Sequence, residues 1–151
     1  MQIEWSLKKF SDLSPYEIYA ILQLRNEVFV VEQNCVFQDA DDKDQASYHL
    51  QGTWQQKLVA YTRIVPPGVI YTEASIGRVV TSPAIRRKSA GRLLMEKSIK
   101  AVYDVCGTGA IKIGAQLYLR NFYESFGFLP ISDTYLEDGI PHIYMQKNAL
   151  S

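Results

Sequence analysis

The chain has 151 residues, a length that fits one domain spanning residues 1–151. Its 16 basic and 16 acidic side chains give a formal net charge of +0, which argues against a surface built to bind nucleic acid. Apolar residues make up 47% of the chain, so we expect a packed core rather than a disordered polypeptide.

Three features favour a cytoplasmic protein. The two cysteines, Cys35 and Cys106, are too few for a disulfide scaffold and fit a reducing compartment. The N-terminus lacks the basic and apolar regions of a signal peptide. Runs of aliphatic or aromatic residues such as Val28–Val31 are far shorter than the roughly 20 residues that cross a bilayer, so no membrane association is expected.

The first third of the chain begins with a short predicted strand over residues 2–6. A helix follows, with Ser14 as its cap and Pro15 at its first position. Apolar residues at helical spacing carry this helix to about Val30. The acidic segment 39–44 comes next, and its charge predicts a solvated loop.

Strand patterns dominate the middle of the chain. Residues 48–54 and 57–65 are predicted to form two strands that are joined by a turn at Gln55-Gln56. Alternating β-branched and aromatic residues predict a further strand over residues 70–81.

The last third alternates between helices and strands. The predicted helices run from about Ser89 to Val105 and from Leu117 to Phe126. The predicted strands cover residues 111–115, 128–135 and 142–146, with a hairpin turn near Asp138-Gly139. Helices between strands, with hairpins at both ends, predict an α/β (α+β) fold with a mixed sheet and helices on its faces.

The segment that joins the strand ending at Thr81 to the next helix combines small and basic residues. Its small residues are Ser89, Ala90 and Gly91, and its basic residues are Arg86, Arg87, Lys88 and Arg92. Small residues allow a close approach to the backbone, and the first turn of a helix offers free N–H groups and the positive end of its dipole. A phosphate or diphosphate suits such a site, and a solvated basic helix start is the alternative.

Two common nucleotide motifs are missing from this segment, the Gly-Lys-Ser/Thr ending of a P-loop and the G-x-G-x-x-G fingerprint. The segment instead resembles the coenzyme A pyrophosphate loop of the GNAT family of N-acetyltransferases, whose pattern is Arg/Gln-x-x-Gly-x-Gly/Ala. Here the pattern reads Arg86-x-x-Ser89-x-Gly91, with Ser89 at the place of the first glycine.

A second motif, Asn121–Phe128, resembles the family's other signature, in which a helix carrying Phe-Tyr is followed by Gly-Phe at the next strand. One helix and one strand separate the two motifs, as in the family. The likeness runs from about the first strand to Met145 and is similar to the ElaA-type branch. The stretches that carry this branch resemblance are Leu24–Cys35, Gln38–Asp41, Tyr48–Leu50 and Glu137–Ile143.

The resemblance implies the GNAT fold, a mixed, mostly antiparallel twisted sheet flanked by helices, with a splay between the central strands. Coenzyme A would lie in the wedge between the strand ending at Thr81 and the strand near 111–115. The resemblance also implies an acetyl-CoA-dependent N-acyltransferase that moves an acetyl group to a primary amine in a ternary complex.

The implied site uses both backbone and side chains. The expected cofactor-binding residues are Val79, Val80, Thr81, Arg86, Arg87, Lys88, Ser89, Ala90, Gly91, Arg92 and Asn121. Backbone N–H groups near Thr81 would polarise the thioester carbonyl. Tyr123 is the candidate general acid, with a core aromatic as the alternative. Because a phenol has a pKa near 10, above that of a thiol, a hydrogen bond to the leaving thiolate is the safer assignment.

No general base stands out. The titratable candidates are Glu32, His49, Glu137 and His142. Histidine has the best-suited pKa, but both histidines lie in strand-like contexts, where a structural hydrogen-bonded role is the alternative. For Glu32 the alternative is a surface salt bridge, and a water relay would need none of the four. Arg25 is either a buried, paired arginine or a group that recognises an acidic acceptor.

No metal site is expected. On the pattern of an EF-hand loop, Lys43 falls on a ligand position and Asp44 on the place that needs glycine. Cysteine and histidine residues do not occur at a recognisable zinc spacing.

Two classes of function stay open, the acetyl-CoA-dependent enzyme and a non-catalytic module that senses acyl-CoA or serves as an interaction surface on the same fold. The basic loop together with Tyr123 favours the enzyme. The acceptor amine is left open between a small molecule, a peptide N-terminus and a lysine side chain. Exposed strand edges favour a homodimer.

Overall fold

The computed structural model describes residues 2–86 and 89–151, so Arg87 and Lys88 lie outside the described residues. The strands are β1 (Glu4–Lys9), β2 (Tyr48–Trp54), β3 (Lys57–Val65), β4 (Ser75–Thr81), β5 (Ile111–Gln116), β6 (Leu129–Pro130), β7 (Tyr135–Glu137) and β8 (Ile140–Lys147). The α-helices are α1 (Pro15–Arg25), α2 (Ala90–Cys106) and α3 (Arg120–Glu124). A π-helix covers Asn26–Glu32, and 3-10 turns cover Phe10–Asp12, Pro83–Ile85 and Leu117–Leu119.

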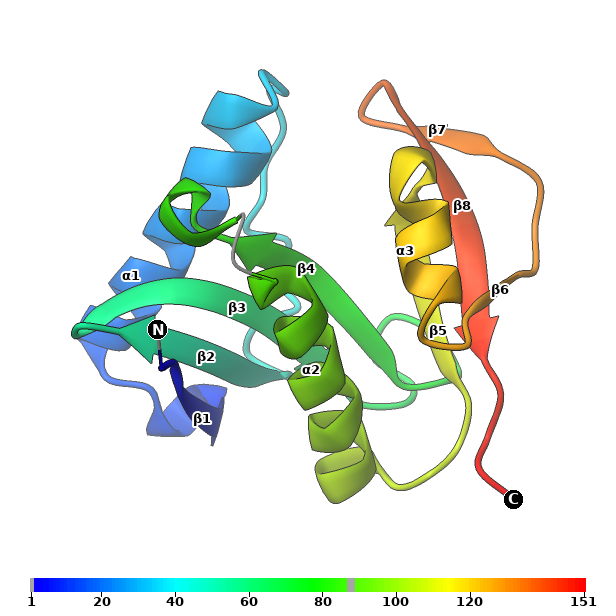
Figure 1. Ribbon diagram of the computed structural model, residues 1–151, viewed down its shortest axis with the longest axis horizontal. Coiled ribbons are helices and arrows are strands. Elements are labelled where there is room, and N and C mark those ends of the chain that lie inside the picture. Colours follow the sequence, from blue (N-terminus) through cyan, green and yellow to red (C-terminus); the bar gives the residue numbers. More distant parts are fainter. Residues whose placement is uncertain (1, 87–88) are drawn as a thin grey trace.

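Two antiparallel sheets meet at one edge. The first has the order β1-β2-β3-β4, and the second has the order β5-β8-β6 with β7 also paired to β8. They are joined by a parallel bridge between Ala74 and Ile111, where the Lys112 N–H donates to the Ala74 carbonyl at 2.9 Å. Beyond this bridge β4 and β5 separate (Figure 1). The predicted mixed, mostly antiparallel sheet with a splay between its central strands is confirmed.

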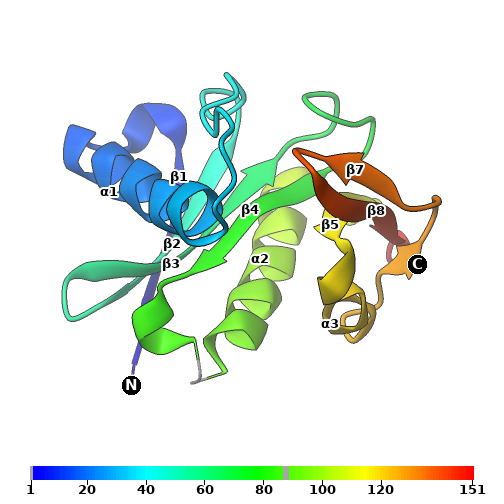
Figure 2. The same cartoon turned by 90° about the horizontal axis from the view of Figure 1, so that it is seen from above.

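Helices cover the two faces of the first sheet, because successive strand residues point to opposite sides. Tyr61 of β3 packs with Leu24 of α1 on one face. Ala60 and Ile64 pack with Leu94 of α2 on the other. Figure 2 shows α1 on one side of the sheet and α2 on the opposite side. The core is therefore formed by two helix–sheet layers that share β3 and β4.

Several predicted elements change their bounds. The helix begins at Pro15 with the Ser14 capping box, but its α-helical part ends at Arg25 and continues as the π-helix. The first strand spans Glu4–Lys9 rather than 2–6. The strand predicted over 70–81 is confined to β4, because the preceding residues form a turn in which the Gly68 N–H donates to the Tyr71 carbonyl.

The strand predicted over 128–135 is also interrupted. Only Leu129–Pro130 and, from Tyr135 on, β7 pair with β8. The predicted hairpin turn is confirmed, since Asp138 and Gly139 both have positive φ values, 51° and 77°, as a type I′ turn requires.

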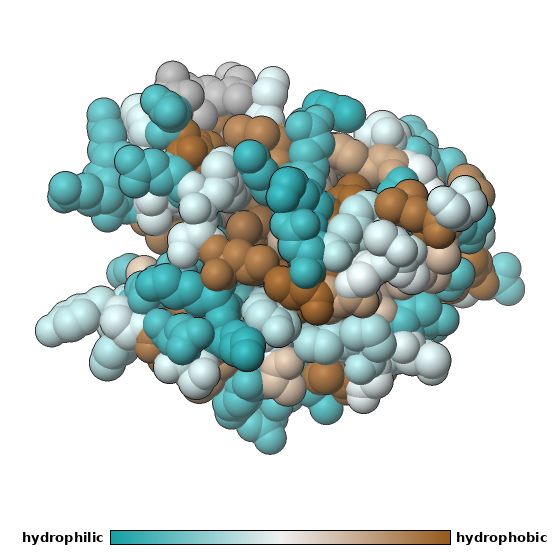
Figure 3. Space-filling view, turned by 90° about the horizontal axis from the view of Figure 1, so that it is seen from below, coloured by the Kyte–Doolittle hydropathy of each residue, from teal (hydrophilic) through white to brown (hydrophobic). Residues whose placement is uncertain are grey.

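Exposed apolar side chains include Val36, Tyr16 and Leu136, which are 97%, 87% and 72% exposed. Seen from below, such side chains form small groups separated by hydrophilic ones (Figure 3). The homodimer stays a prediction.

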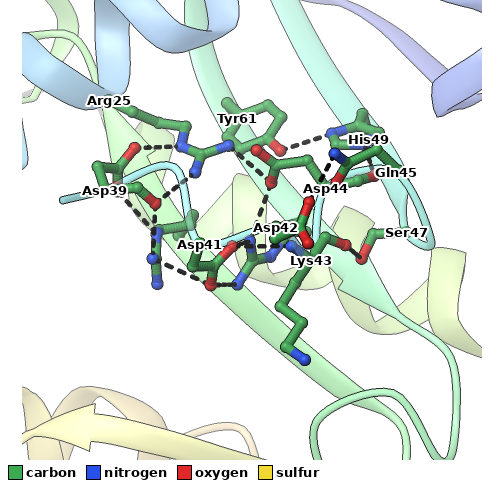
Figure 4. Close-up of polar contacts among 12 residues, drawn as sticks. Arg25, Asp39, Asp41, Asp42, Lys43, Asp44, Gln45, Ser47, His49 and Tyr61 are labelled. Atoms are coloured by element: carbon green, nitrogen blue, oxygen red, sulfur yellow. Dashed lines mark hydrogen bonds and ion pairs between the residues drawn. The ribbon is translucent and has the colours of Figure 1, made fainter.

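Residues 39–44 form a loop, as expected, but it is solvated only in part, since Asp42 and Lys43 are exposed whereas Asp39 is buried. Three arginines and three aspartates pair with one another between α1 and the sheet (Figure 4). They are Arg25, Arg63, Arg78, Asp39, Asp41 and Asp44. Arg25 is 0% exposed, and its Nε donates to Asp39 Oδ2 at 2.7 Å. Arg25 is thus the buried, paired arginine of the two alternatives, and burial of its charge requires acidic partners.

Candidate active site

The separation of β4 from β5 opens a cleft of about 790 Å³, lined by both strands, α3, the π-helix and the β7–β8 hairpin. It brings together many residues singled out in the sequence. Those expected to bind the cofactor or act as acid are Val79, Val80, Thr81, Arg86, Gly91 and Tyr123. The candidate bases among its lining residues are Glu32, Glu137 and His142.

Other predicted residues do not line the cleft. Ser89 and Asn121 are exposed beside it, while Ala90 is 1% exposed and packs in a small core cluster. The Arg92 guanidinium turns toward the end of α3, where Nη1 donates to Ser125 Oγ at 3.1 Å. Because the Ala90 side chain is buried, this residue could offer a ligand only its backbone. Arg87 and Lys88 fall outside the described part of the chain.

His49, the fourth candidate base, belongs to the buried network near α1. Its Nδ1 lies 2.7 Å from the Tyr61 hydroxyl, and its Nε2 lies 2.9 Å from the Asp44 carbonyl. With both ring nitrogens bonded and 1% of its surface exposed, His49 has the structural role that was its alternative.

The wall formed by β4 contains a bulge. The ladder to β3 shifts register between Tyr61 and Arg63, where Arg78 and Val79 face a single residue of β3. Arg78 takes a left-handed φ of 51°, and its Nε donates to Asp39 Oδ1 at 2.8 Å. The buried ion pairs therefore support this irregular backbone at the edge of the cleft.

Sequence reasoning did not single out Arg78, although it lines the cleft. An arginine next to Gly77 within a strand pattern is a signal that could have indicated the bulge, because a glycine inside a strand often marks one.

The backbone of Thr81 faces the open edge of β4. The Ser82 N–H donates to the Val59 carbonyl of β3 at 2.7 Å, so the main-chain groups of Thr81 point the other way along the alternating strand. In agreement, the Thr81 carbonyl accepts a hydrogen bond from Arg86 Nη2 at 3.4 Å. A ligand in the cleft can reach this edge because β5 has already moved away from it.

The start of α2 shows why the family pattern has a glycine at the position of Ser89. Ser89 has φ 57° and ψ 21°, the left-handed conformation that glycine adopts without steric cost. Two residues later, a Cβ added to Gly91 would have only Phe122 Cζ, at 3.9 Å, within 4 Å. The backbone at the helix N-terminus is therefore open to close approach by an anion.

Arg86 forms an ion pair with Glu32. The two side chains form a bidentate pair, with 2.6 Å from Nη2 to Oε1 and 2.7 Å from Nη1 to Oε2. The hydrogen bond from Arg86 lowers the pKa of Glu32, so Glu32 stays ionised and is a weak proton acceptor. The surface salt bridge considered for Glu32 is thus present, with a partner that also lines the cleft.

Tyr123 lies at the floor of the cleft on α3. Its ring packs edge-on against Phe122 and Phe128, with centroids 5.2 and 6.1 Å away, and 6% of the residue is exposed. Burial raises the pKa of its phenol, so the hydroxyl keeps its proton at neutral pH. The residue is both a core aromatic and a lining residue, and the two alternatives do not exclude each other.

A family model for the acetyltransferase (GNAT) domain matches residues 14–149. The chain belongs to the GNAT family of acetyltransferases. It is similar to protein ElaA of Escherichia coli, with 43% identity over 98% of both chains, and the ElaA crystal structure superposes with a TM-score of 0.91 over 97% of this chain and 100% of that one. The predicted likeness to the ElaA-type branch is confirmed.

Two further solved structures share the fold. An acyl-CoA N-acyltransferase from Pseudomonas aeruginosa is 38% identical, with a TM-score of 0.93 over 97% of this chain and 99% of that one. An aminoglycoside 6'-N-acetyltransferase complexed with coenzyme A is similar in fold alone, at 16% identity and a TM-score of 0.71 over 97% of this chain and 98% of that one. The family and the fold support acyl transfer from coenzyme A.

In the described part of the chain, every helix is too short or too polar to span a bilayer. No group of three or more His, Cys, Asp or Glu side chains in residues 2–86 and 89–151 is placed to hold a metal ion.

Proposed function

We propose that the protein is an N-acetyltransferase that moves the acetyl group of acetyl-CoA directly to a primary amine, with both substrates bound in the cleft. The observation that carries this proposal is the convergence, in one cleft, of the open edge of β4, the free start of α2 and the Tyr123 side chain. The edge of β4 would bind the thioester, the start of α2 would bind the diphosphate, and Tyr123 would stabilise the leaving thiolate.

The start of α2 suits the diphosphate of the cofactor. Gly91 has room for close approach, Ser89 is already in the left-handed conformation, and Arg86 supplies a guanidinium at the mouth. N–H groups in the first turn of a helix, together with a guanidinium, bind phosphate oxygens through short charge-assisted hydrogen bonds.

The edge of β4 suits the pantetheine arm and the thioester. A chain containing amide groups can pair with the free main-chain groups near Thr81 as an added strand would, and a backbone N–H of the bulge can polarise the thioester carbonyl. Holding the amine and the thioester together supplies much of the catalysis, on the order of 7–11 kcal/mol in favourable cases.

Tyr123 then donates a hydrogen bond to the sulfur as the C–S bond breaks. Its phenol keeps its proton at neutral pH, so it is available as a donor throughout the reaction. A donor to a developing anion is worth more than one to a neutral group, which favours the transition state over the ground state.

The test measures the release of free thiol from acetyl-CoA with a panel of amines, alongside binding of acetyl-CoA by calorimetry. We expect amine-dependent thiol release by the wild type and weakened acetyl-CoA binding in Arg86→Glu. Binding of acetyl-CoA without its consumption by any amine would favour the non-catalytic acyl-CoA sensor. No binding at all would contradict both functions.

A further inference from the structure

His142 is the histidine that faces the cleft. It lies in β8, opposite Gln116 of β5 and Tyr135 of β7, and it is 7% exposed. Its ring stacks on that of Tyr135, with centroids 5.7 Å apart and planes at 29°. Stacking on Tyr135 therefore restricts the orientation of the imidazole at the wall of the cleft.

The hydrogen bond of Nδ1 determines which ring nitrogen is basic. Nδ1 lies 2.7 Å from the Ile140 carbonyl oxygen, which can only accept, so Nδ1 carries the proton. In the neutral ring Nε2 then holds the lone pair. Among the described residues Nε2 has no hydrogen bond, and its one ionic neighbour is Glu137 Oε2 at 3.5 Å. His49, by contrast, uses both ring nitrogens within the buried network.

The charges of the cleft are unevenly distributed. The two arginines among its described lining residues already have acidic partners, Arg86 in Glu32 and Arg78 in Asp39 and Asp41. At the tip of the β7–β8 hairpin, the Glu137 carboxylate is 60% exposed. Asp138, next to it in the cleft lining, has no ion pair in the described part of the chain. This end of the cleft is therefore negative, which attracts a cation.

The same hairpin tip contacts the opposite wall. The Cys35 thiol lies 3.4 Å from the Asp138 carbonyl oxygen, so the segment that follows the π-helix reaches the hairpin there. We call the part of the cleft lined by Glu137, Asp138, Ile140 and His142 the acceptor end. It lies on the opposite side of β5 from α2, on the second sheet, as Figure 2 shows for the β7–β8 hairpin and the start of α2.

We propose that the acceptor end binds a protonated primary amine, with Glu137 holding the ammonium group and His142 Nε2 removing its proton. This inference rests on the proposed acetyl transfer. The first proton passes from the ammonium to Nε2 and forms an imidazolium. The amine nitrogen then bonds to the acetyl carbon, and the C–S bond breaks. The second proton passes from the nitrogen to the departing thiolate as the amide forms, which gives the free thiol, and the imidazolium returns its proton to solvent.

The first experiment separates proton removal from binding. His142→Asn keeps a side-chain N–H that can donate to the Ile140 carbonyl but has no basic nitrogen. We expect kcat with a panel of benzylamine, tyramine, spermidine and glycinamide to fall about 100-fold, the lower range for a lost general base, with unchanged acetyl-CoA affinity. Glu137→Gln should mainly raise KM for the amine, while Glu96→Gln, an exposed glutamate of α2, serves as the matched control.

The second experiment uses a nucleophile that needs no base. O-Benzylhydroxylamine has a similar carbon skeleton to benzylamine but is neutral at the assay pH. If Nε2 removes the proton of the ammonium group, His142→Asn loses much less activity with the oxyamine than with the amine. Equal losses with both nucleophiles, or no loss with either, would overturn the inference and leave the proposed function intact.

A third readout needs no turnover. The chain has two histidines, so loss of one imidazole signal set in His142→Asn assigns the other set in a 15N spectrum. The spectrum of the wild type should show the tautomer with hydrogen on Nδ1, and the opposite tautomer would overturn the inference. A wild-type protein that consumes no acetyl-CoA with any nucleophile would overturn the proposed function and this inference together.

Discussion

Arg86 and Glu32, which both line the cleft, are joined by two contacts of 2.6 and 2.7 Å. The partners are 54 residues apart in sequence, one just after β4 and the other at the end of the π-helix. The same guanidinium is the proposed ligand of a diphosphate. Glu32 and the cofactor therefore compete for Arg86.

Removing this competitor should strengthen cofactor binding. Exposed ion pairs contribute about 0.2–1 kcal/mol, so we expect Glu32→Gln to bind acetyl-CoA up to about 5-fold more tightly. Isothermal titration calorimetry measures the effect, with Glu4→Gln in β1 as the control. Weaker binding in Glu32→Gln would mean that the carboxylate supports the site instead of competing for it.

Tyr123→Phe should lower turnover without loosening the cofactor. The change removes one hydroxyl and keeps the ring contacts with Phe122 and Phe128. A hydrogen bond to a charged group is worth about 1.5–3 kcal/mol, which corresponds to a decrease in kcat of roughly 10- to 100-fold. Steady-state kinetics and acetyl-CoA titration check the two parts separately. Unchanged turnover with every acceptor would remove Tyr123 from the mechanism.

Asp39 should be critical for stability. It is 5% exposed and binds both Arg25 and Arg78, so Asp39→Asn removes one of the two acidic partners of each guanidinium. Breaking a buried pair in this way costs about 3–5 kcal/mol of unfolding free energy, measured by urea denaturation. Asp42→Asn in the same segment is the control. Asp42 is exposed, and asparagine tolerates its φ of 66°, so the change should stay within about 0.5 kcal/mol.

The ion network should also make the protein sensitive to acid. Burial alone would raise the pKa of Asp41, but hydrogen bonds from Arg63 and the charges of Arg63 and Arg78 lower it from 3.8 to about 2. A carboxyl group with a lower pKa in the folded state stabilises the fold above its unfolded pKa. That contribution is lost as the pH falls toward the folded value.

We therefore expect the unfolding free energy to fall between about pH 4 and pH 2, and to fall less steeply in Asp41→Asn. Part of the slope should remain, because hydrogen bonds from Ser14, Gln51 and Lys8 outweigh burial and lower the pKa of Glu17 to about 2 as well. Urea denaturation at a series of pH values measures both slopes. Parallel curves for the two proteins would contradict the assignment to Asp41.

Ser89→Gly should stabilise the protein and retain the proposed diphosphate site at the start of α2. A residue with a side chain is strained by about 1 kcal/mol in the left-handed conformation that Ser89 adopts, and glycine is not. We expect an unfolding free energy higher by up to about 1 kcal/mol, with equal or tighter acetyl-CoA binding. Ser89→Val should have the opposite effect on both, since β-branched residues rarely adopt this conformation. Loss of acetyl-CoA binding in Ser89→Gly would contradict the proposed diphosphate site at the start of α2.

The sequence by itself determined the order of elements, the two faces of the sheet and the position of both motifs. Capping by Ser14, the hairpin at Asp138-Gly139 and the strand pattern of residues 57–65 are local signals, set by neighbours within a few residues. The family patterns around Gly91 and Tyr123 likewise lie in short stretches of chain, so the sequence alone is enough to identify them.

Only the tertiary structure decided which charges are buried and which groups meet in the cleft. The acidic segment 39–44 carries the composition of a solvated loop, but Asp39 is buried and Asp41 and Asp44 are half-buried, because Arg25, Arg63 and Arg78 reach them from three other elements. The pairing of Arg86 with Glu32, 54 residues apart, likewise depends on residues distant in sequence. Desolvation and ion pairing depend on which residues meet in the folded chain, so local sequence patterns do not predict them.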